Sequence, residues 1–434
     1  MTGVVTTTAN SRLANRERFV LIAGSAFVAV TVLAGPLRMY LSLAGLSPLI
    51  YVPNLMLLLA IAWQLIAELR ERGLTASRLI AFLIPGYALA IALQFVPAVQ
   101  AAMGFYVLLP FVYGIACGRV LLERWHTICR ILPYIWLLVV AGVLANLAVD
   151  YPWEGFGYRL GSLDVDGSRQ WYAGGGNKRL AGFARASFDA AVQIQVAGIL
   201  LALKIRSKML RLLVWLLTIA AILPTNSKGV LLAVAVITPV VLLRRALPEL
   251  PLRALPALFG AIGIALPVAT LMFVFDSPLK DPALANATHS FYDRLNYMWP
   301  EAWALLGEQG HWLLGRGVGG IGTAQTYFEP ALFNAGDNLF MYWFVIFGWA
   351  ALPGFAMLLL ISLRVRPFRT ATELQFYCLL LATLVYGVMT NIVENAISAL
   401  VCGLQVHWLV ARHPVASTGL PTGTAVAAVR PAGS

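Results

Sequence analysis

The sequence predicts an all-α fold: a polytopic integral membrane helical bundle with two enlarged extramembrane loops. The first reason is composition, because 60% of the 434 residues are hydrophobic and 12% are charged, whereas charged residues make up about a quarter of a soluble domain. The second is the mean hydropathy of +0.80. The third is that apolar residues form long continuous runs, which exclude the alternating strands of a transmembrane β-barrel.

Apolar runs recur along the whole chain and predict about 12 transmembrane helices, since about 20 apolar residues cross the hydrocarbon layer. Two pairs of runs, 210–224 with 229–243 and 375–391 with 396–411, are shorter and are joined by brief polar turns. We interpret each pair as a helical hairpin whose tip lies below the lipid headgroups. The runs are 19–37, 49–68, 79–97, 101–118, 131–149, 187–203, 210–224, 229–243, 256–275, 339–362, 375–391 and 396–411.

The net charge is +12, and the distribution of basic residues along the chain agrees with the predicted topology. With the N-terminus in the cytoplasm, most lysines and arginines fall in cytoplasmic segments that hold few acids. This pattern is the positive-inside rule and not the basic patch of a nucleic-acid-binding protein. The same topology places the loops 150–186 and 277–338 on the outer side.

The predicted organisation has three parts. They are a cytoplasmic N-terminal tail (1–18), a single transmembrane domain (19–411) and a cytoplasmic C-terminal tail (412–434). The tails are rich in Thr, Ala, Gly and Pro and are expected to be disordered. The first apolar run is long enough to span, so we expect no cleavable signal. All 4 cysteines lie in or near the membrane or on the cytoplasmic side, so we expect no structural disulfide.

The first outer loop ends with three cations at the start of an apolar helix: Lys178, Arg179 and Arg185. The free N–H groups of a helix N-terminus attract anions, and nearby cations make such a place suitable for pyrophosphate. The alternative is that these side chains only anchor the loop at the headgroups. Asp164-Val165-Asp166 matches a metal-binding Asp-x-Asp, but solvated loop acids explain it better, and the histidines lack metal-ligand spacing.

The second outer loop offers two further cations. Arg294 begins a short amphipathic helix over 292–306 and could pair with Asp293 or with a phosphate. Arg316 lies in Gly315-Arg316-Gly317-Val318-Gly319-Gly320, a formal G-x-G-x-x-G without the preceding strand of a dinucleotide site. This glycine segment fits either a backbone nest for an anion or a tight turn.

Polar residues also stand at the ends of three predicted helices. Asp337 and Asn338 precede an apolar run, where either could be the N-cap and the other a reactive group; a carboxylate here could be a general base. Lys228 at one hairpin tip could snorkel to the headgroups or line a cavity. Glu394 at the other tip could orient one of the outer cations.

The order of these motifs resembles the O-antigen polymerase/O-antigen ligase superfamily, which includes the Wzy-type polysaccharide polymerases. The resemblance covers about 177–411 and is carried by four motifs in order. The ligase branch has a histidine where this chain has Asp337, which favours a polymerase of exopolysaccharide or O-antigen repeat units, with xanthan-type polymerases as the nearest relatives. The motifs are Arg179-Leu180-Ala181-Gly182, Ser227-Lys228-Gly229, Arg294 with Trp303 and Gly315–Gly319, and Asp337-Asn338-Leu339-Phe340.

The resemblance implies a metal-independent, inverting glycosyltransferase without a cofactor, at the periplasmic face of the bacterial inner membrane. It would transfer a growing glycan from polyprenyl pyrophosphate to a lipid-linked repeat unit. Asp337 would be the catalytic base, with Asn338 and Glu394 as orienting residues. The expected partners are membrane lipid, a chain-length regulator and a flippase of the same pathway, but no nucleic acid. The leaving pyrophosphate would be bound by Arg179, Arg185, Lys228, Arg294 and Arg316.

Three alternatives stay open from the sequence. The first is an O-antigen ligase. The second is a transporter or flippase of lipid-linked oligosaccharide, a class that usually has broken helices and charges near the membrane midplane. The third is a structural partner in a polysaccharide assembly complex.

Overall fold

The computed structural model describes residues 3–72, 75–161, 163–173, 176–243, 247–275, 282–365 and 370–412, with 3–14 and 282–287 described by their backbone alone. The expected disorder of the C-terminal tail therefore lies almost wholly outside the described residues. The N-terminal tail differs from expectation, because helix α1 (Gly3–Val32) already begins at Gly3. Residues predicted to be disordered thus continue the first apolar helix toward the N-terminus.

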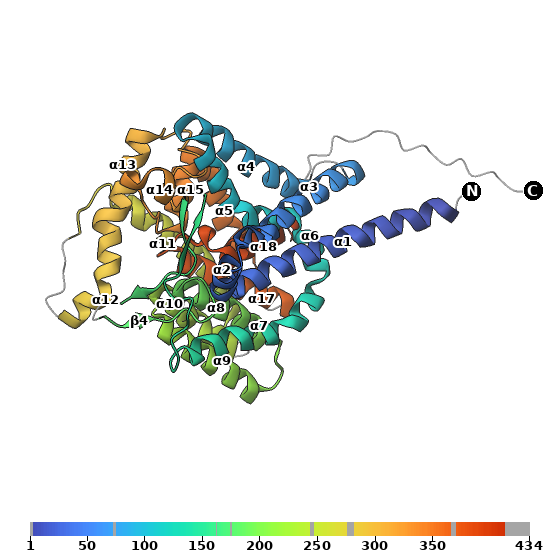
Figure 1. Ribbon diagram of the computed structural model, residues 1–434, viewed down its shortest axis with the longest axis horizontal. Helices are drawn as coiled ribbons and strands as arrows, with labels where there is room; N and C mark the ends of the chain where they lie inside the picture. Colours follow the sequence, from blue (N-terminus) through green and yellow to red (C-terminus); the bar gives the residue numbers. More distant parts are fainter. Residues whose placement is uncertain are drawn as a thin grey trace, which may run out of the picture.

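The all-α membrane bundle is confirmed (Figure 1). In the described residues eight helices are long and apolar enough to cross a membrane, or nine if α1 and α2 (Ala34–Leu43), which meet at 87°, form one span. Three shorter apolar helices, α10 (Lys228–Leu243), α17 (Ala371–Gly387) and α18 (Ala396–Arg412), do not reach that length, so the predicted number of spans is not confirmed. The long helices are α3 (Val52–Arg72) with its preceding turn, α4 (Ala76–Phe95), α5 (Ala98–Ala116), α7 (Trp125–Ala145), α8 (Ser187–Lys204), α9 (Lys208–Ile222) with its following turn, α11 (Glu249–Ala269) and α15–α16 (Leu339–Phe347 and Ala351–Ser362).

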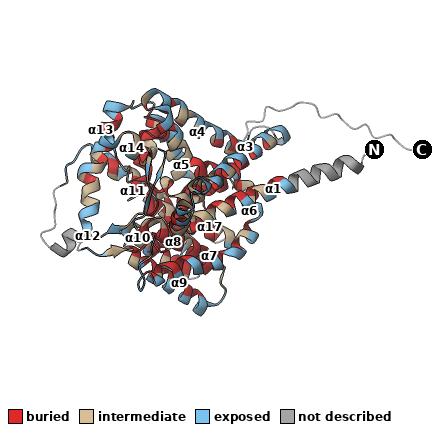
Figure 2. Cartoon of the chain, viewed as in Figure 1, coloured by how far each residue is buried: buried red, intermediate tan, exposed pale blue. Residues whose placement is uncertain are grey.

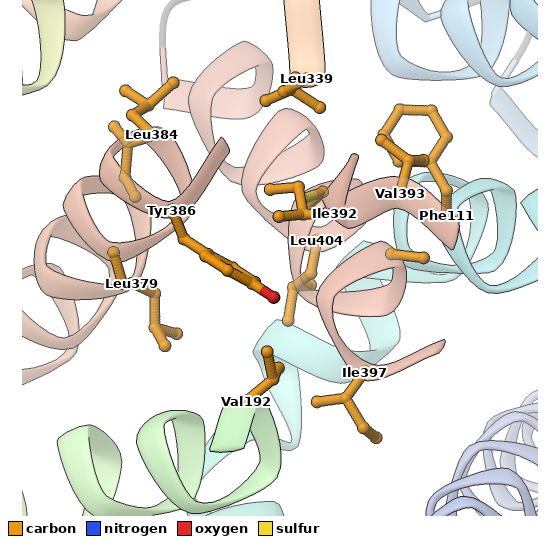
Figure 3. Packing of buried hydrophobic residues seen from close by; sticks show 14 of the residues in the cluster. Phe111, Val192, Leu339, Leu379, Leu384, Tyr386, Ile392, Val393, Ile397 and Leu404 are labelled. Carbon is orange, nitrogen blue, oxygen red and sulfur yellow. The ribbon is translucent and has the colours of Figure 1, made fainter. Parts of the chain in front are cut away.

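The centre of the bundle is formed by α5, α8, α17 (Ala371–Gly387) and α18 (Ala396–Arg412), whose side chains are mostly buried (Figure 2). Peripheral helices such as α3, α9 and α16 expose leucines on their outer faces. Lipid would cover these leucines, because a spanning helix has no need to be polar on the side that faces hydrocarbon. Figure 3 shows the central packing, where Tyr386 extends from α17 toward Val192 of α8 and Ile397 of α18.

The two long loops are more ordered than the sequence indicates. The first contains two small antiparallel hairpins, β1 (Gly157–Leu160) with β2 (Leu163–Asp166), and β3 (Trp171–Tyr172) with β4 (Lys178–Arg179). The second contains α12 (Pro282–Asp293), a π-helical turn (Arg294–Met298), α13 (Trp299–Gln309) and α14 (Thr323–Phe328). The helix predicted over 292–306 is therefore present, but it is part of a longer helical stretch that starts in α12 and contains the π-turn.

Both loops meet the hairpin tips at one end of the bundle. The amide of Leu180 in the first loop donates to the carbonyl of Pro224 at the α9–α10 tip, where α10 is Lys228–Leu243. Thr323 in the second loop donates to Glu394 at the α17–α18 tip. Residues that are far apart in the sequence are thus brought together at this end.

Candidate functional site

The centre of the site is an ion pair between the second loop and the start of α15. Arg294 Nη2 lies 2.7 Å from Asp337 Oδ2, and the two side chains are 16% and 21% exposed. Arg294 Nη1 also donates to the carbonyl of Ser290 at 2.5 Å, while its Nε is buried with no partner. Arg294 opens the π-helical turn, and single π-turns inside helices are frequent at functional sites.

The structure decides which of Asp337 and Asn338 caps α15. Asn338 Oδ1 accepts hydrogen bonds from the amides of Phe340 and Met341, both at 2.9 Å. Its Nδ2 donates to the carbonyls of Gly263 and Val388. Asn338 is therefore the buried N-cap that ties α15 to its neighbours, and the Asp337 carboxylate is left for Arg294.

Arg179 lies within electrostatic range of Arg294. Its Nε donates to the carbonyl of Thr225 at 3.2 Å, and its guanidinium lies 5.6 Å from the centre of the Trp171 ring. Burial lowers the pKa of Arg179, and the like charge of Arg294 acts in the same direction. Because arginine stays protonated in proteins, the two guanidinium groups repel each other.

Gly182 explains how the first loop reaches this position. Its φ is +59°, and an added Cβ would lie 2.8 Å from the backbone nitrogen of Val143 on α7. The Gly182 amide donates to Asn146, and its carbonyl accepts from Trp153. Only glycine allows this backbone conformation and this close approach at low cost, so the Arg-x-x-Gly segment fixes Arg179 against the bundle.

Tyr386 is a site residue that the sequence analysis missed. Its hydroxyl lies within electrostatic range of Asp337, Asp189 and Arg179. Its ring covers the start of α10, where an added Cβ on Gly229 would lie 2.8 Å from it. The neighbouring Lys228 is exposed at the first residue of α10. A tyrosine near the end of an apolar helix is typical of a membrane belt, which is why it gave no separate signal.

Arg185 belongs to a second group of cations rather than to the Arg294–Asp337 pair. Burial lowers its pKa, and the charges of Arg38 and Arg169 act in the same direction. Asp189, in the first turn of α8, lies within electrostatic range of all three arginines. Its carboxylate also accepts a hydrogen bond of 2.5 Å from Asn395. Arg38 and Arg169 were not singled out from the sequence.

Arg316 has a different environment from the other predicted cations. It is 1% exposed, and its Nη2 lies 2.8 Å from Glu329. Its Nε donates to the carbonyl of Gln309, and its Nη1 donates to the carbonyl of Gly320. The structure therefore places this guanidinium inside the loop, with its nitrogens already bonded, and away from the Arg294–Asp337 pair.

The glycine turn around Arg316 is a packing element and not an open nest. An added Cβ on Gly317 would lie 2.1 Å from the nitrogen of Ala92. The Gly317 amide donates to the carbonyl of Ile346, and the Val318 amide donates to the carbonyl of Ala88. Because these amides are bonded to α15 and α4, they cannot also bind an anion.

Glu394 is bound by the second loop. Its carboxylate accepts from the amide of Thr323 at 3.0 Å, from the Thr323 hydroxyl at 2.7 Å and from the hydroxyl of Tyr342 at 3.1 Å. No hydrogen bond or ion pair within the described ranges joins it to a predicted cation, although Arg169 is in electrostatic range. Its visible role is to hold α14 against the α17–α18 tip.

Lys178, beside Arg179, forms ion pairs with Asp150 and Glu154. In the part of the chain that the structure describes, no three His, Cys, Asp or Glu side chains gather in a group that could hold a metal ion.

No family model, no curated protein and no solved structure matches this chain.

Proposed function

We propose that this protein is a polysaccharide polymerase of the periplasmic face of the bacterial inner membrane. It would transfer a growing glycan from polyprenyl pyrophosphate to the sugar hydroxyl of a lipid-linked repeat unit. The observation that carries this proposal is the arrangement of Arg294, Asp337 and Arg179 at one end of a multi-pass membrane bundle. This arrangement offers cations that would bind a leaving diphosphate and a carboxylate that would accept a proton, both beside the lipid.

The cations would act on the leaving group. As the bond between the anomeric carbon and the diphosphate breaks, negative charge develops on the diphosphate oxygens, and fixed cations stabilise that charge. Arg179 and Arg294 can each offer a planar pair of donors to phosphate. Lys228, exposed at the adjacent tip, would add a point charge. A single displacement by the acceptor hydroxyl inverts the anomeric carbon.

The carboxylate would act on the acceptor. Burial raises the pKa of Asp337, while the charge and hydrogen bond of Arg294 oppose this rise. A diphosphate that engages Arg294 would compete with Asp337 for the same guanidinium. The carboxylate would then lose its cation and become a stronger base, ready to accept the proton of the incoming hydroxyl. Binding of the donor would in this way activate the base.

The test is incubation of the purified protein with a polyprenyl pyrophosphate-linked repeat unit, read as a ladder of glycan lengths on a gel. Asp337→Asn and Arg294→Gln should each slow the growth of the ladder by at least about a hundredfold and leave membrane insertion unchanged. Asp164→Asn, an exposed acid on β2 that pairs with Arg159, is the matched control and should keep the ladder. A full-length ladder from Asp337→Asn would exclude the proposed base.

One observation favours the transporter alternative. The α1–α2 pair bends by 87°, and a short 3-10 turn (Gly348–Ala350) separates α15 from α16; discontinuous helices are common in transporters. Against it, the Arg294–Asp337 pair stands before the start of α15 and not in the middle of a span. Reconstituted vesicles would separate the two functions: flipping of a lipid-linked oligosaccharide without elongation would favour the transporter. A ligase would attach the glycan to lipid A and make no ladder.

A further inference from the structure

A second group of basic and aromatic side chains lies beside the proposed reaction site. Its arginines come from three separate segments: Arg38 from α2, Arg169 from the turn after β2, and Arg185 from the end of the first loop. The backbone brings two of them together, since the amide of Arg169 donates to the carbonyl of Arg185 at 2.8 Å. The 87° bend after α1 carries Arg38 to the same place.

These guanidinium groups have unused hydrogen-bond donors. Arg38 Nη1 donates to the hydroxyl of Tyr158 at 3.2 Å, but its Nε is buried with no partner. Arg185 uses its Nε for the carbonyl of Asp166, and among the described residues its Nη nitrogens have no recorded acceptor. The hydroxyl of Ser187, at the first residue of α8, is also buried without a partner. A buried donor without an acceptor is costly, and a ligand oxygen would remove that cost.

The local carboxylates compensate these charges only in part. The Asp189 carboxylate lies within electrostatic range of all three arginines, but one of its oxygens already accepts a hydrogen bond from Asn395. Asp166 lies 3.2 Å from Arg169 but is 63% exposed, and such surface pairs contribute little.

Tyrosines border the same arginines. The hydroxyl groups of Tyr51 and Tyr158 lie 3.0 Å apart, and the ring of Tyr51 packs against that of Tyr106 at 5.9 Å between centroids. All three rings are partly exposed. Arginine forks suit planar oxyanions, and tyrosines offer both an apolar face and a hydroxyl, a combination that fits an acidic sugar.

From this arrangement we infer that Arg38, Arg169 and Arg185 form a second oxyanion site, which binds an acidic sugar of the glycan. The inference deepens the proposed function, since it rests on a lipid-linked glycan as the substrate. The shared chemistry is an oxyanion, and its source could be a sugar carboxylate or a second diphosphate. The position favours the sugar, because Tyr158 lies on β1 and Arg169 lies in the polar turn after β2, whereas Arg179 contacts the α9–α10 tip between two apolar helices.

The experiment measures binding of two soluble probes to the full-length protein in detergent. One probe is a trisaccharide of glucuronic acid, and the other is the corresponding trisaccharide of glucose. The wild type should bind the acidic probe at least about tenfold more tightly, as expected for hydrogen bonds to a charged group. Arg38→Gln and Arg169→Gln should each remove most of that preference, while Arg38→Lys should keep part of it.

The matched control is Arg159→Gln, on the same β1–β2 hairpin, whose arginine pairs with Asp164 in full solvent exposure at 2.9 Å. It should bind the acidic probe like the wild type. Gel filtration would show whether Arg38→Gln folds. If it does not, Arg169→Gln still tests the site, because Arg169 lies in a loop and not in a helix. Equal binding of both probes by the wild type, or an equal loss in the Arg159→Gln control, would overturn the inference.

A third probe separates the two sources of the oxyanion. If polyprenyl pyrophosphate without sugar displaces the acidic trisaccharide from the wild type, and still displaces it in Arg294→Gln, where the reaction site has lost a cation, the second site belongs to a diphosphate and the acidic-sugar inference is wrong. Failure of the inference is distinct from failure of the proposed function. Selective binding without any elongation would exclude the polymerase alone, and elongation without acidic preference would exclude the sugar site alone.

Discussion

Asp337→Asn is the most informative perturbation of the proposed reaction site. The amide keeps the size of the carboxylate, and its oxygen can still accept the hydrogen bond of 2.7 Å from Arg294. The N-cap of α15 is unaffected, since Asn338 provides it. The variant therefore removes the basic group while it leaves the positions of α13 and α15 in place, so a loss of activity would report chemistry and not unfolding.

The expected loss follows from the role of a general base. Such a group contributes about 10²–10⁴ in rate, which corresponds to about 3–5 kcal/mol of transition-state stabilisation. Arg294→Gln should cost about 10²–10³ in kcat, as removal of one donor to a developing oxyanion does. The double variant should lose less than the product of the two effects, because the side chains contact each other and residues in contact are not additive.

The dependence of activity on pH tests independently whether Asp337 is the general base. Burial raises the pKa of Asp337 above its ordinary value of 3.8, and a base works only when it is deprotonated. Activity should therefore fall as the pH decreases through this raised pKa, at a higher pH than for an ordinary aspartate. Arg294→Gln should move this acid limb to still higher pH, because Arg294 lowers the pKa of Asp337, and Asp337→Asn should have no such limb.

The assay is the initial rate of elongation of a lipid-linked repeat unit as a function of pH, at substrate concentrations well below KM, where the rate reports the ionisation of the free enzyme. Thermal unfolding in detergent serves as the control for folding. An Asp337→Asn enzyme with the wild-type rate, or an acid limb that stays at the same pH in Arg294→Gln, would refute the assignment of the base.

Three further predictions concern other residues of the two long loops. Arg316→Met should lower the free energy of unfolding by about 3–5 kcal/mol, because it leaves Glu329 without its partner in a largely buried pair; an unchanged melting temperature would contradict the structural role. Gly182→Ala should cost about 1–3 kcal/mol, since its φ is +59° and its Cβ would meet Val143, and differential scanning fluorimetry would measure this loss. Arg179→Lys should lower kcat about tenfold, because it keeps the charge but loses the planar fork and the ring contact; an unchanged elongation rate would place Arg179 outside the reaction.

The helices were predictable because their signal is local. Each of the apolar runs identified from the sequence overlaps a helix of the structure, since length and continuity of apolar residues suffice to predict one. The 87° bend between α1 and α2 was missed, because the run 19–37 stays apolar through the break at Leu33, although Gly35-Pro36 just after it is a helix-breaking pair. This bend gives Arg38 its position, and the residue was therefore overlooked. The short hairpins of the first loop carry too few residues to show alternation.

The site was predictable only in part, because its contacts are long-range. The sequence indicated that one residue of the Asp337-Asn338 pair would cap α15, but both types cap well, and only the contacts of Asn338 decide between them. The pair of Arg294 with Asp337 spans 43 positions. From the sequence, both Arg294 and Arg316 were predicted to bind the pyrophosphate, although Arg316 is buried inside a loop and Arg294 is not.

The contrast between these arginines shows how to separate structural from functional cations at a membrane surface. Each nitrogen of the Arg316 guanidinium donates to an oxygen of the protein, so a ligand could bind it only by breaking existing bonds. Arg294 and Arg38, by contrast, each keep a buried Nε without an acceptor, as does Arg16, whose Nη1 pairs with Glu71. An unsatisfied buried donor is unfavourable, and at Arg294 and Arg38 the charges of other arginines add to this cost. An anionic ligand at either place would relieve both costs at once, and this is the physical reason to look for substrate there.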